Sequence, residues 1–416
     1  MNAILERTAS IIWGNGMMIL LLGAGAVCTV RTKAVQLLLP RFLFMHIKER
    51  HSRNKEQFRT VCTSLGAAMG TGNITGVSTA LATGGPGAVF WMWISAFLGM
   101  ALVFTENRLS AIYSRGKAKG TLGYIRYGLG SKTLAAVFAV SCCGAAGGMG
   151  GMGQVSSASE AVRRCCDIPS WGIAIGSFIL VYAVISGGGQ RIRYIAQLLL
   201  PAVSVIYAII CICCILRFRR NIFSSLQSIF SSAFGLRQAA GGLLGHTLST
   251  TISVGLRRGI FSNEAGLGSS AMLHSCSESE NSTDQGMWGM FEVFVDTFVC
   301  CSLTALAVLC AAPDMEILTV FTSVTGIYAP LVLAVILSVF ALCTVIGWYY
   351  CGEMAFSYLT ADKWKKAAAF VFSAAASLGA LVSVPAVWSL SDIFNGLMAF
   401  PNLTAVLFVR TDKNSK

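Results

Sequence analysis

The sequence predicts an all-α protein that crosses a membrane many times. Of its 416 residues, 55% are hydrophobic and only 12% are charged, whereas a soluble domain has about 25% charged residues. The mean hydropathy is +0.68. Apolar runs long enough to cross ~30 Å of hydrocarbon recur along the chain. These observations indicate a polytopic membrane protein built from helices.

About eleven segments are expected to be transmembrane helices, each long enough to cross the bilayer core. The first follows Arg7 and has the look of a signal peptide. Its length, Trp13 and the lack of a convincing small-residue cleavage site favour a retained span. The expected spans are 10–30, 62–82, 87–111, 134–159, 171–188, 195–216, 236–257, 287–311, 328–356, 367–383 and 386–409.

Basic residues between the spans predict the orientation. The loop from Arg31 to Arg59 carries eight Lys and Arg residues, the strongest basic block in the chain, so the positive-inside rule places it in the cytoplasm. The N-terminus is then outside the cell's inner (plasma) membrane and the C-terminus is cytoplasmic. Alternation of the spans places Arg257 and Arg258 on the cytoplasmic side as well.

One loop departs from this rule. Residues 217–220 carry three arginines on the expected outer side, where they are expected to begin an interfacial amphipathic stretch over 222–236. The net charge of +13 lies in short loops without interleaved aromatic residues. It therefore indicates contact with membrane lipid and no nucleic-acid partner.

The 15 cysteines do not form a metal-site pattern. The one Cys-x-x-Cys, Cys211 to Cys214, lies in an apolar run without a second pair or a nearby histidine. The cysteines are therefore interpreted as small buried apolar side chains.

The second expected span is interrupted by glycines and small polar residues. Residues 66–87 read GAAMGTGNITGVSTALATGGPG, with Gly70-Thr71-Gly72-Asn73 inside the run. In hydrocarbon every backbone group must be paired, so such a cluster is tolerated only where it faces protein, water or a ligand. The segment is predicted to be a broken helix at a binding site, with residues 84–87 as the turn to the next span.

A second cluster suggests an internal repeat. Without the first span, ten remain, and the second five open with Gly241 to Thr247, which reads GGLLGHT. Because five is odd, the two halves would have inverted topology. Paired glycine-interrupted segments point to a transporter site, whereas scattered glycines are better explained by close helix packing. The expected parts are an N-terminal span and basic loop (1–59), a first five-helix repeat (60–217), an interfacial stretch with the second repeat (218–409), and a cytoplasmic tail (410–416).

Four long motifs then resemble one known family. Residues 70–76 read GTGNITG, 84–93 read GGPGAVFWMW, 258–269 read RGIFSNEAGLGS and 392–399 read DIFNGLMA. Over nearly the whole chain, the sequence resembles the alanine or glycine:cation symporters. The resemblance implies secondary active uptake of a small neutral amino acid with a monovalent cation, sodium or proton. It also implies a LeuT-like inverted-repeat fold with one added N-terminal span, and no cofactor besides the coupling ion.

The chemistry of such a substrate selects candidate residues. A zwitterionic amino acid needs amide hydrogens for its carboxylate and oxygen acceptors for its ammonium, and sodium prefers oxygen ligands. The candidate substrate-binding residues are Gly70, Gly72, Asn73, Gln154, Gly242, Asp296, Thr344 and Trp348. The candidate cation-binding residues are Thr71, Asn73, Cys343 and Thr344.

Asp296 is the sharpest ionisable signal, because a carboxylate inside the membrane costs at least ~2.5–3.5 kcal/mol. It is interpreted as a substrate or cation group, or else as a structural hydrogen-bond anchor. Glu292 is expected to be solvated near the cytoplasmic end of the same span. Glu106 is expected to pair with Arg108 at the surface.

Trp348 follows Thr344 by four residues, so both project from one face of a helix. The resemblance places this segment in the substrate pocket, with the tryptophan limiting side-chain volume; an interfacial tryptophan is the alternative. His246 is either a packing residue or a proton-coupling group. Residues 262–264 are interpreted as a gate, or as a cap for a helix that begins at Ala265.

The chain departs from the family pattern at four positions. Gly151 and Ser156 flank Gln154 where the family usually has asparagines, and Gln197 replaces an expected glutamate. Cys343 stands where a hydroxyl residue is expected, and a thiol is a poorer sodium ligand. These departures leave the coupling cation and the strict alanine or glycine preference open. An uncoupled facilitator remains an alternative, whereas no catalytic motif supports a membrane enzyme and no signalling domain supports a receptor.

Overall fold

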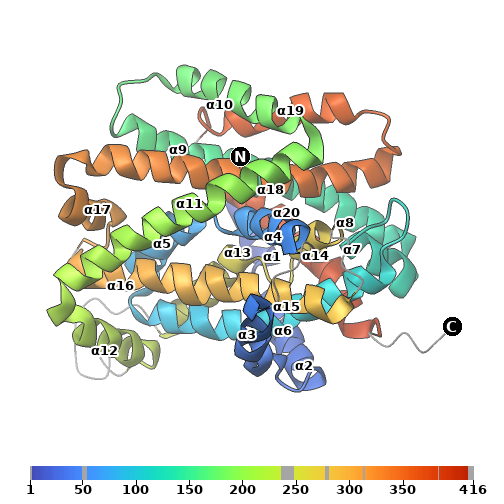
Figure 1. Cartoon of the computed structure of the whole chain (residues 1–416), viewed down its shortest axis with the longest axis horizontal. Coiled ribbons are helices and arrows are strands. Elements are labelled where there is room, and N and C mark those ends of the chain that lie inside the picture. The colour runs from blue at the N-terminus through green and yellow to red at the C-terminus, as the bar shows by residue number, and fades with distance from the viewer. Residues whose placement is uncertain are drawn as a thin grey trace.

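The computed structural model describes residues 2–48, 54–235, 248–276, 281–312, 314–382 and 384–410. Within these ranges the chain forms helices and no strand (Figure 1). The first part contains α1 (Asn2–Ile12), α2 (Asn15–Arg31), α3 (Leu39–Lys48), α4 (Asn54–Ala68), α5 (Thr75–Gly84), α6 (Gly87–Tyr113), α7 (Thr121–Gly123), α8 (Lys132–Ala145), α9 (Gln154–Arg163), α10 (Ser170–Ile185) and α11 (Gly188–Arg217). The second contains α12 (Ile222–Ala233), α13 (Leu248–Asn263), α14 (Ser269–His274), α15 (Ser282–Val293), α16 (Ser302–Ala311), α17 (Ile317–Thr325), α18 (Ala329–Thr360), α19 (Lys365–Leu378) and α20 (Val384–Phe408).

Five continuous helical stretches of the described residues are long and apolar enough to cross a membrane. They are Gly87–Tyr113, Lys132–Arg163, Gly188–Arg217, Ser282–Ala311 and Ile317–Thr360. A sixth is obtained if the pair Gly16–Arg31 and Val35–Met45, bent by 60°, counts as one span. Most of the other segments expected to span are shorter or interrupted helices, and α20, although 25 residues long, is not among the five, so the total of about eleven spans stays a prediction.

The predicted interruption of the second span is present. α4 ends at Ala68, a 3₁₀ turn covers Thr71–Asn73, and α5 begins at Thr75. α5 ends at Gly84, and Gly85 has a φ of +72° before α6 begins at Gly87. Only glycine adopts that backbone conformation freely. The 84–87 segment is therefore the predicted turn to the next helix.

A second interruption lies between α13 and α14. Residues 264–268 connect the two helices, and Glu264, Gly266 and Gly268 have φ angles of +55°, +87° and +79°. The sequence placed the second break at 241–247, which lies outside the described residues. The break at 264–268 was missed because RGIFSNEAGLGS was interpreted as a surface loop and cap.

The described residues contain three π-helical stretches, of which Tyr124–Gly128 follows α7 and the other two join long helices. Ala146–Gly153 joins α8 to α9, and Phe294–Cys301 joins α15 to α16. A π-helical turn carries an extra residue and frequently marks a functional position inside a helix. These two stretches hold Gly150 and Asp296, which both take part in the contacts described below.

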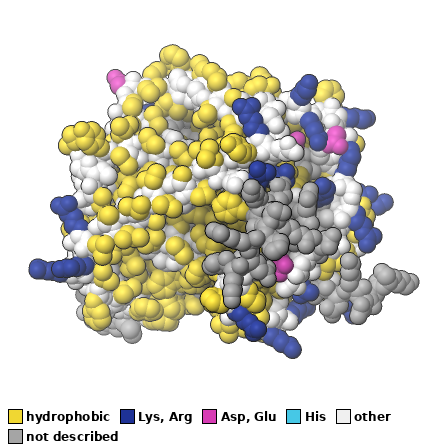
Figure 2. All heavy atoms as spheres, viewed as in Figure 1, with side chains coloured by type: hydrophobic (Ala, Val, Ile, Leu, Met, Phe, Trp, Pro, Cys, Tyr) yellow, Lys and Arg dark blue, Asp and Glu magenta, His cyan; other side chains and the backbone are white. Residues whose placement is uncertain are grey.

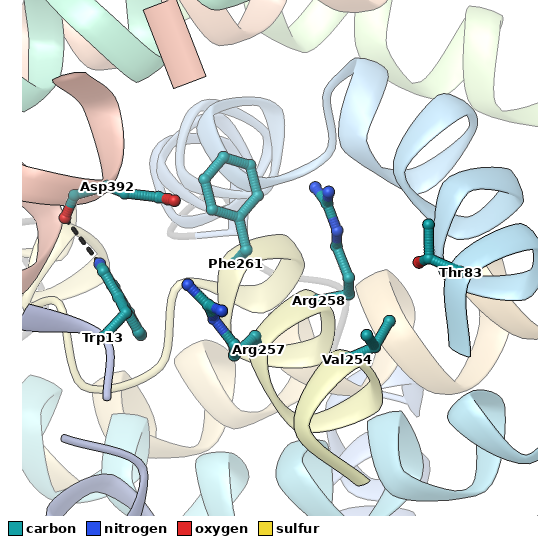
Figure 3. A pocket seen from close by; sticks show the side chains of 7 residues that line it. All are labelled: Trp13, Thr83, Val254, Arg257, Arg258, Phe261 and Asp392. Carbon is teal, nitrogen blue, oxygen red and sulfur yellow. Dashed lines mark hydrogen bonds between the residues drawn. The ribbon is translucent and has the colours of Figure 1, made fainter. Parts of the chain in front are cut away.

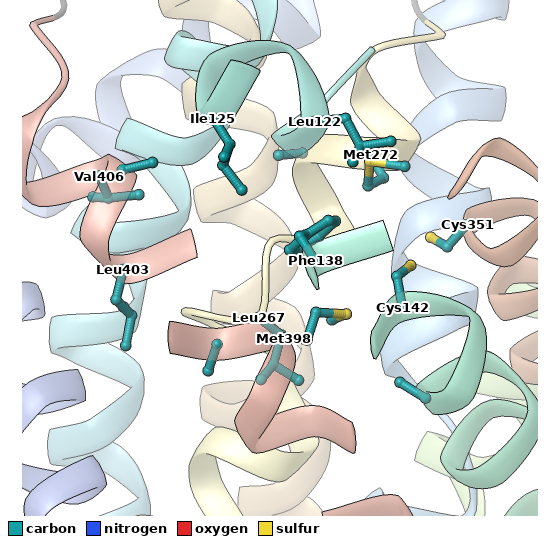
Figure 4. Packing of buried hydrophobic residues seen from close by; sticks show 14 of the residues in the cluster. Leu122, Ile125, Phe138, Cys142, Leu267, Met272, Cys351, Met398, Leu403 and Val406 are labelled. Carbon is teal, nitrogen blue, oxygen red and sulfur yellow. The ribbon is translucent and has the colours of Figure 1, made fainter. Parts of the chain in front are cut away.

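The largest buried cluster lies among α2, α6, α8, α14, α18 and α20. Figure 4 shows Phe138 of α8 among Leu122, Met272, Leu267 and Met398. The packing of α8 on α20 is close, because a Cβ on Gly144 would lie 2.4 Å from the Phe394 ring. Small residues allow helix backbones to approach in this way within membranes.

The surface has an apolar band. Yellow side chains cover much of the face in Figure 2, and the visible Lys and Arg side chains gather mainly toward its right-hand side. Large apolar side chains on α10 and α11, among them Ile179, Leu198 and Ile206, are more than half exposed. An exposed apolar band of this kind is expected where lipid replaces water.

The predicted interfacial stretch forms α12. Ser225, Ile229 and Ala233 are buried, whereas Phe223 is 79% exposed, so one face of the helix packs on the protein, and its position at the membrane interface stays a prediction. It packs on α6, where the Trp91 indole N–H donates to the Ala233 carbonyl at 3.1 Å. The described cysteines are free thiols, and among the described residues there is no metal-binding group of His, Cys, Asp and Glu side chains.

Candidate functional site

The break between α4 and α5 is held by side chains that bind its backbone. The Gly70 N–H donates to Asn73 Oδ1 at 3.1 Å. The backbone N–H and hydroxyl of Thr71 both donate to Gln154 Oε1, at 3.1 and 3.0 Å. Gln154 lies at the start of α9, so the first break is tied to a helix more than eighty residues away. The backbone groups that the break frees are thereby paired inside the protein.

Asp296 forms the centre of a buried polar cluster. Its carboxylate accepts from Asn73 Nδ2 at 2.6 Å, from the Ser262 hydroxyl at 2.8 Å and from the Thr297 hydroxyl at 2.9 Å. Asn73 also lies within 3.4 Å of Cys301 Sγ. The residues come from the first break, the end of α13 and the π-helical stretch after α15. Asp296 thus joins the two interrupted helices, and its three donors satisfy the rule that a buried charge is hydrogen-bonded.

Thr344 of α18 faces the carbonyl groups at the end of α4. Its hydroxyl lies 3.0 Å from the Gly66 oxygen and 3.4 Å from the Met69 oxygen. A Cβ on Gly70 would lie 2.6 Å from the same hydroxyl oxygen. Cys343 is buried beside it, and a Cβ on Gly66 would lie 3.5 Å from the Cys343 Cβ. The neighbourhood therefore presents a hydroxyl and two carbonyl oxygens, with the thiol next to them.

Trp348 lies one turn further along α18 and is completely buried. Its indole N–H donates to Glu264 Oε1 at 2.8 Å, and the Ser269 hydroxyl donates to Glu264 Oε2 at 2.5 Å. Gly150 packs against the tryptophan, because a Cβ there would lie 2.2 Å from Trp348 Cβ. Its burial excludes the alternative of an interfacial tryptophan.

Several candidate residues therefore come together. Around the first break the structure assembles Gly70, Thr71, Asn73, Gln154, Asp296 and Thr344. Cys343 and Trp348 are on the same helix as Thr344. Gly72 borders open space, because a Cβ there would meet no atom within 4 Å. Gly242 and His246 lie outside the described residues.

Ser262, Asn263 and Glu264 are more than the predicted cap. Ser262 binds Asp296, and the Asn263 amide donates to Thr297 at 3.2 Å. Asn263 Oδ1 accepts from the Ala265 N–H at 3.1 Å, but the next helix begins at Ser269. The prediction of a helix that begins at Ala265 was wrong, since residues 264–268 form the second break.

Two acidic residues predicted at the surface are buried. Glu292 is 4% exposed and bound by Ser64 and His274, and Glu106 is 0% exposed. Glu106 accepts from Asn402 Nδ2 at 2.6 Å instead of lying at the surface with Arg108. The predictions failed because each helix is covered at that end by a partner distant in sequence. Gln197, which stands where the resembled family has a glutamate, accepts a hydrogen bond from Arg59 Nε at 2.9 Å.

Asn402 joins Glu106 to the second break. Its amide also donates to the Gly266 carbonyl at 2.8 Å, and the Thr121 hydroxyl donates to the Gly268 carbonyl at 2.7 Å. The Tyr124 hydroxyl binds Asn402. The carbonyls of the second break are thus paired by buried side chains, as a break within a membrane requires.

A cavity of about 200 Å³ lies next to this region, lined by Trp13, Thr83, Val254, Arg257, Arg258, Phe261 and Asp392 (Figure 3). Phe261 directly precedes Ser262, so the cavity and the polar cluster both draw on the end of α13. Thr83 is at the end of α5 and the basic loop precedes α4. Because Arg257 and Arg258 line the same cavity as Thr83, they lie at the end of the broken α4–α5 helix that is opposite the basic loop. The prediction of a shared side was wrong, because the second break lets α13 and α14 continue as one interrupted helix.

The sequence as a whole matches one family. The model described as the sodium:alanine symporter family matches residues 1–413. The chain belongs to the sodium:alanine symporter family. Members of this family are transporters, so the chain is a multi-pass membrane transporter and not an enzyme.

Its relatives in this symporter family align along nearly their whole length. A transporter of Haemophilus influenzae is 35% identical, with 98% of this chain and 94% of that protein covered. A sodium/alanine symporter, AgcS, of Methanococcus maripaludis is 33% identical with the same coverage of 98% and 94%. A probable sodium/glutamine symporter, GlnT, of Bacillus subtilis is 32% identical over 98% of this chain and 89% of that protein.

The fold also resembles solved structures. A mutant of a manganese transporter from Eremococcus coleocola superposes with a TM-score of 0.59 and 14% sequence identity, covering 83% of this chain and 76% of that chain. At this identity the likeness concerns the fold alone. It places this symporter among all-helical transporter folds.

Proposed function

We propose that the protein takes up a small neutral amino acid, alanine or glycine, together with sodium. The observation that carries this proposal is the meeting of the Gly70–Asn73 break with the Asp296 carboxylate and the Thr344 hydroxyl. Interrupted helices near mid-membrane form substrate and ion sites in secondary transporters. The family and the sodium/alanine and sodium/glutamine symporters among its relatives support the same substrate class.

We propose that the amino-acid substrate binds beside Gly72. The open space at its Cα leaves room for a ligand, and a helix break offers amide hydrogens to a carboxylate. Gln154 and Asn73 bring side-chain oxygens for the ammonium group, and the Asp296 carboxylate supplies compensating negative charge. Trp348 closes the site one turn from Thr344 and limits the side-chain volume. Gly242 completes the proposed set from the second half of the chain.

The cation is placed between α4 and α18. The Thr344 hydroxyl oxygen and the carbonyl oxygens of Gly66 and Met69 converge there, and sodium prefers such oxygen ligands. Thr71 and Asn73 contribute further oxygens at the break. Cys343 belongs to the proposed site as the neighbour of Thr344, with a softer side chain that weakens sodium preference. No organic cofactor is required.

The architecture proposed for transport is a LeuT-like pair of inverted five-helix repeats after one added span. The first repeat (60–217) opens with the interrupted α4 and α5, and the second repeat (218–409) contains the interrupted α13 and α14, which supports the pairing. The basic loop before α4 is placed in the cytoplasm, with the N-terminus outside and residues 410–416 inside. Alternating access then moves one helix group against the rest.

Replacing Thr344 by valine tests the cation site. Valine keeps the shape of threonine but removes the oxygen that faces Gly66 and Met69. We expect the sodium concentration for half-maximal alanine uptake to rise about tenfold, since losing one hydrogen-bonding oxygen costs on the order of 1–2 kcal/mol. Thr344→Ser restores the wild-type value. The measurement is uptake as a function of sodium concentration, and an unchanged sodium dependence in Thr344→Val would remove Thr344 from the site.

A panel of uptake measurements tests the proposed function. Purified protein in liposomes is offered labelled glycine, alanine, serine, glutamine and leucine under sodium, lithium or proton gradients. We expect alanine or glycine uptake that requires sodium, and little uptake of leucine because Trp348 limits volume. Uptake that proceeds at the same rate without any ion gradient would instead support an uncoupled facilitator.

A further inference from the structure

A second buried ionisable cluster lies away from the proposed substrate site. Its centre is His274 at the end of α14, which is 3% exposed, and Glu292 of α15. His274 Nε2 lies 2.7 Å from Glu292 Oε1, and Nδ1 lies 2.7 Å from Gln285 Oε1. The other carboxylate oxygen of Glu292 accepts from the Ser64 hydroxyl at 2.6 Å and from the Ser270 hydroxyl at 3.1 Å.

The hydrogen-bond partners indicate how many protons this pair carries. Gln285 Nε2 donates to Gln57 Oε1 at 2.9 Å, so the atom that faces His274 Nδ1 is the amide oxygen, which only accepts. Nδ1 therefore carries a hydrogen. The 2.7 Å contact from Nε2 to Glu292 then needs a second hydrogen, carried by either atom. Without it, either the Glu292 contact or the Gln285 contact loses its hydrogen.

This proton holds together two half-helices on one side of the breaks. Glu292 binds α4 through Ser64 and α14 through Ser270 and His274. α4 precedes the first break and α14 follows the second. In the inverted arrangement these are the two halves nearest the basic loop. Losing the proton removes one of the contacts that join α14 to α15.

The side chains around His274 and Glu292 leave this pair as the site at which a proton exchanges. α4 contributes Ser64 and the thiol of Cys62, α6 contributes Asn107, which binds Ser270, and α15 contributes Gln285. From α18, the Cys351 thiol binds the Ser269 carbonyl and not the pair. Of the other carboxylates, Glu264 interacts electrostatically with Glu292 but is held by Trp348 and Ser269, and Asp296, four residues beyond Glu292, is held by Asn73 and Ser262. Glu106 of α6 binds Asn402 instead, and α7 (Thr121–Gly123) carries no ionisable side chain.

A charged cavity lies near the end of α14, close in sequence to His274. This cavity of about 460 Å³ begins at Cys276, two residues beyond His274, and also touches Tyr350 of α18. It is strongly charged, with Lys117 and Lys365 both paired to Asp362 and with Arg193, Lys119 and Glu353 in its wall. This cavity lies at the end of the interrupted helices opposite the cavity of Figure 3, which is lined by Arg257, Arg258 and Thr83.

We propose that His274 and Glu292 form a proton-binding site that locks the α4 and α14 side of the transporter closed. With the proton bound, the pair joins α4, α14 and α15. When the proton leaves through the Cys276 cavity, the lock weakens and this side opens. The proposal rests on the proposed function in one respect, because it assigns the opening of that side to release of the amino acid into the cytoplasm.

The first experiment sets the pH on each side of liposomes independently at a fixed sodium gradient. We expect alanine uptake to rise about threefold or more when the luminal pH is raised from about 6 to about 8, the range over which a histidine changes protonation. Glu292→Gln keeps a permanent hydrogen on the carboxamide that mimics the proton-bound state. Its uptake should stay at the low, acidic rate at every luminal pH. His274→Ala removes the contact between His274 and Glu292. Its uptake should stay at the high, alkaline rate at every luminal pH.

A matched control separates this effect from a general loss of charge. Glu160→Gln alters a carboxylate that pairs with Arg164 at the exposed surface of α9, and it should keep the wild-type response to luminal pH. If Glu292→Gln retains the wild-type response, the proton site is excluded. Equal sensitivity to external and luminal pH in the wild type would also contradict the proposal.

A second experiment needs no substrate and so separates failure of the lock from failure of the proposed function. Hydrogen exchange of the peptide Ser269–Cys276 is followed in detergent between about pH 6 and pH 8, after correction for the intrinsic pH dependence. We expect protection to fall with rising pH in the wild type and to remain high in Glu292→Gln. Constant protection in the wild type would overturn the lock, whether or not alanine is transported. A lock that responds to pH in a protein without sodium-driven uptake would overturn only the proposed function.

Discussion

Asn73→Ala is expected to abolish alanine uptake while the protein remains in the membrane at wild-type abundance. The substitution removes the amide that donates to Asp296 at 2.6 Å and the oxygen that accepts from the Gly70 N–H. Because Asn73 is neutral, the cost is that of two lost buried hydrogen bonds, about 1.5–3 kcal/mol for the bond to the carboxylate and about 1–3 kcal/mol for the Gly70 N–H left unpaired. If that cost falls on the transport-competent arrangement, uptake drops by roughly a hundredfold or more, since about 1.4 kcal/mol corresponds to tenfold. Initial uptake rates normalised to membrane abundance provide the measurement.

A control variant at Thr79 and a second variant at Asp296 sharpen the test of Asn73→Ala. Thr79→Ala changes an exposed hydroxyl on α5, which binds only the Thr75 carbonyl in the same helix, and should leave uptake near the wild-type rate. Asp296→Ala should be as severe as Asn73→Ala, and the double variant should be no worse than either single variant, because the two side chains act as one unit. Near-normal uptake in both single variants would defeat the assignment of this cluster.

Gly70→Ala is the second large expected effect. An alanine Cβ would lie 2.6 Å from the Thr344 hydroxyl oxygen and 2.7 Å from Gln154 Oε1. Gln154 is held by both polar groups of Thr71, and Thr344 by the end of α4, so neither neighbour can retreat without loss. Overpacking of this kind costs about 1–3 kcal/mol, which predicts a loss of uptake of about tenfold to a hundredfold.

Gly176→Ala provides the control, away from the break. Gly176 lies within α10, is exposed, and a Cβ there would meet no atom within 4 Å. Alanine is also the better helix former, so this variant should fold and transport as the wild type does. If Gly70→Ala transports as well as Gly176→Ala, the close approach of Thr344 and Gln154 to the break has no role in transport.

The first break could be predicted from local chemistry. Four consecutive small or polar residues, Gly70 to Asn73, interrupt an apolar run, and a membrane helix has no local means of pairing the freed backbone. The turn at Gly84 to Gly87 and the helix α12 follow from equally local signals. What pairs the break is not local, because Gln154, Asp296 and Thr344 reach it from other helices.

The break at 264–268 was missed for a physical reason. Glu264 and the adjacent arginines make the RGIFSNEAGLGS segment polar, so it is easily taken for a surface loop. In the structure, buried partners satisfy it, with Trp348 and Ser269 on Glu264 and Asn402 on the Gly266 carbonyl. The sequence signal that could have located this break is the pair Gly266 and Gly268, which the structure holds at positive φ.

The burial of two acidic residues was not predicted, for a related reason. Glu106 and Glu292 lie near the ends of apolar runs, where a carboxylate is normally solvated. Their partners, Asn402 for Glu106 and Ser64 and His274 for Glu292, come from distant parts of the chain. Pairing between distant segments does not appear in a single sequence, so the prediction of solvated side chains was the natural but wrong one.

Concentrative uptake tests the central claim most directly. Liposomes that contain the purified protein and no internal sodium receive labelled alanine with sodium outside. We predict that alanine accumulates inside above its external concentration and that a sodium ionophore collapses this accumulation. The Asn73→Ala protein should accumulate none. Alanine that only equilibrates across the membrane, at a rate independent of sodium, would contradict the proposal of a sodium-coupled symporter built on the Gly70–Asn73 break.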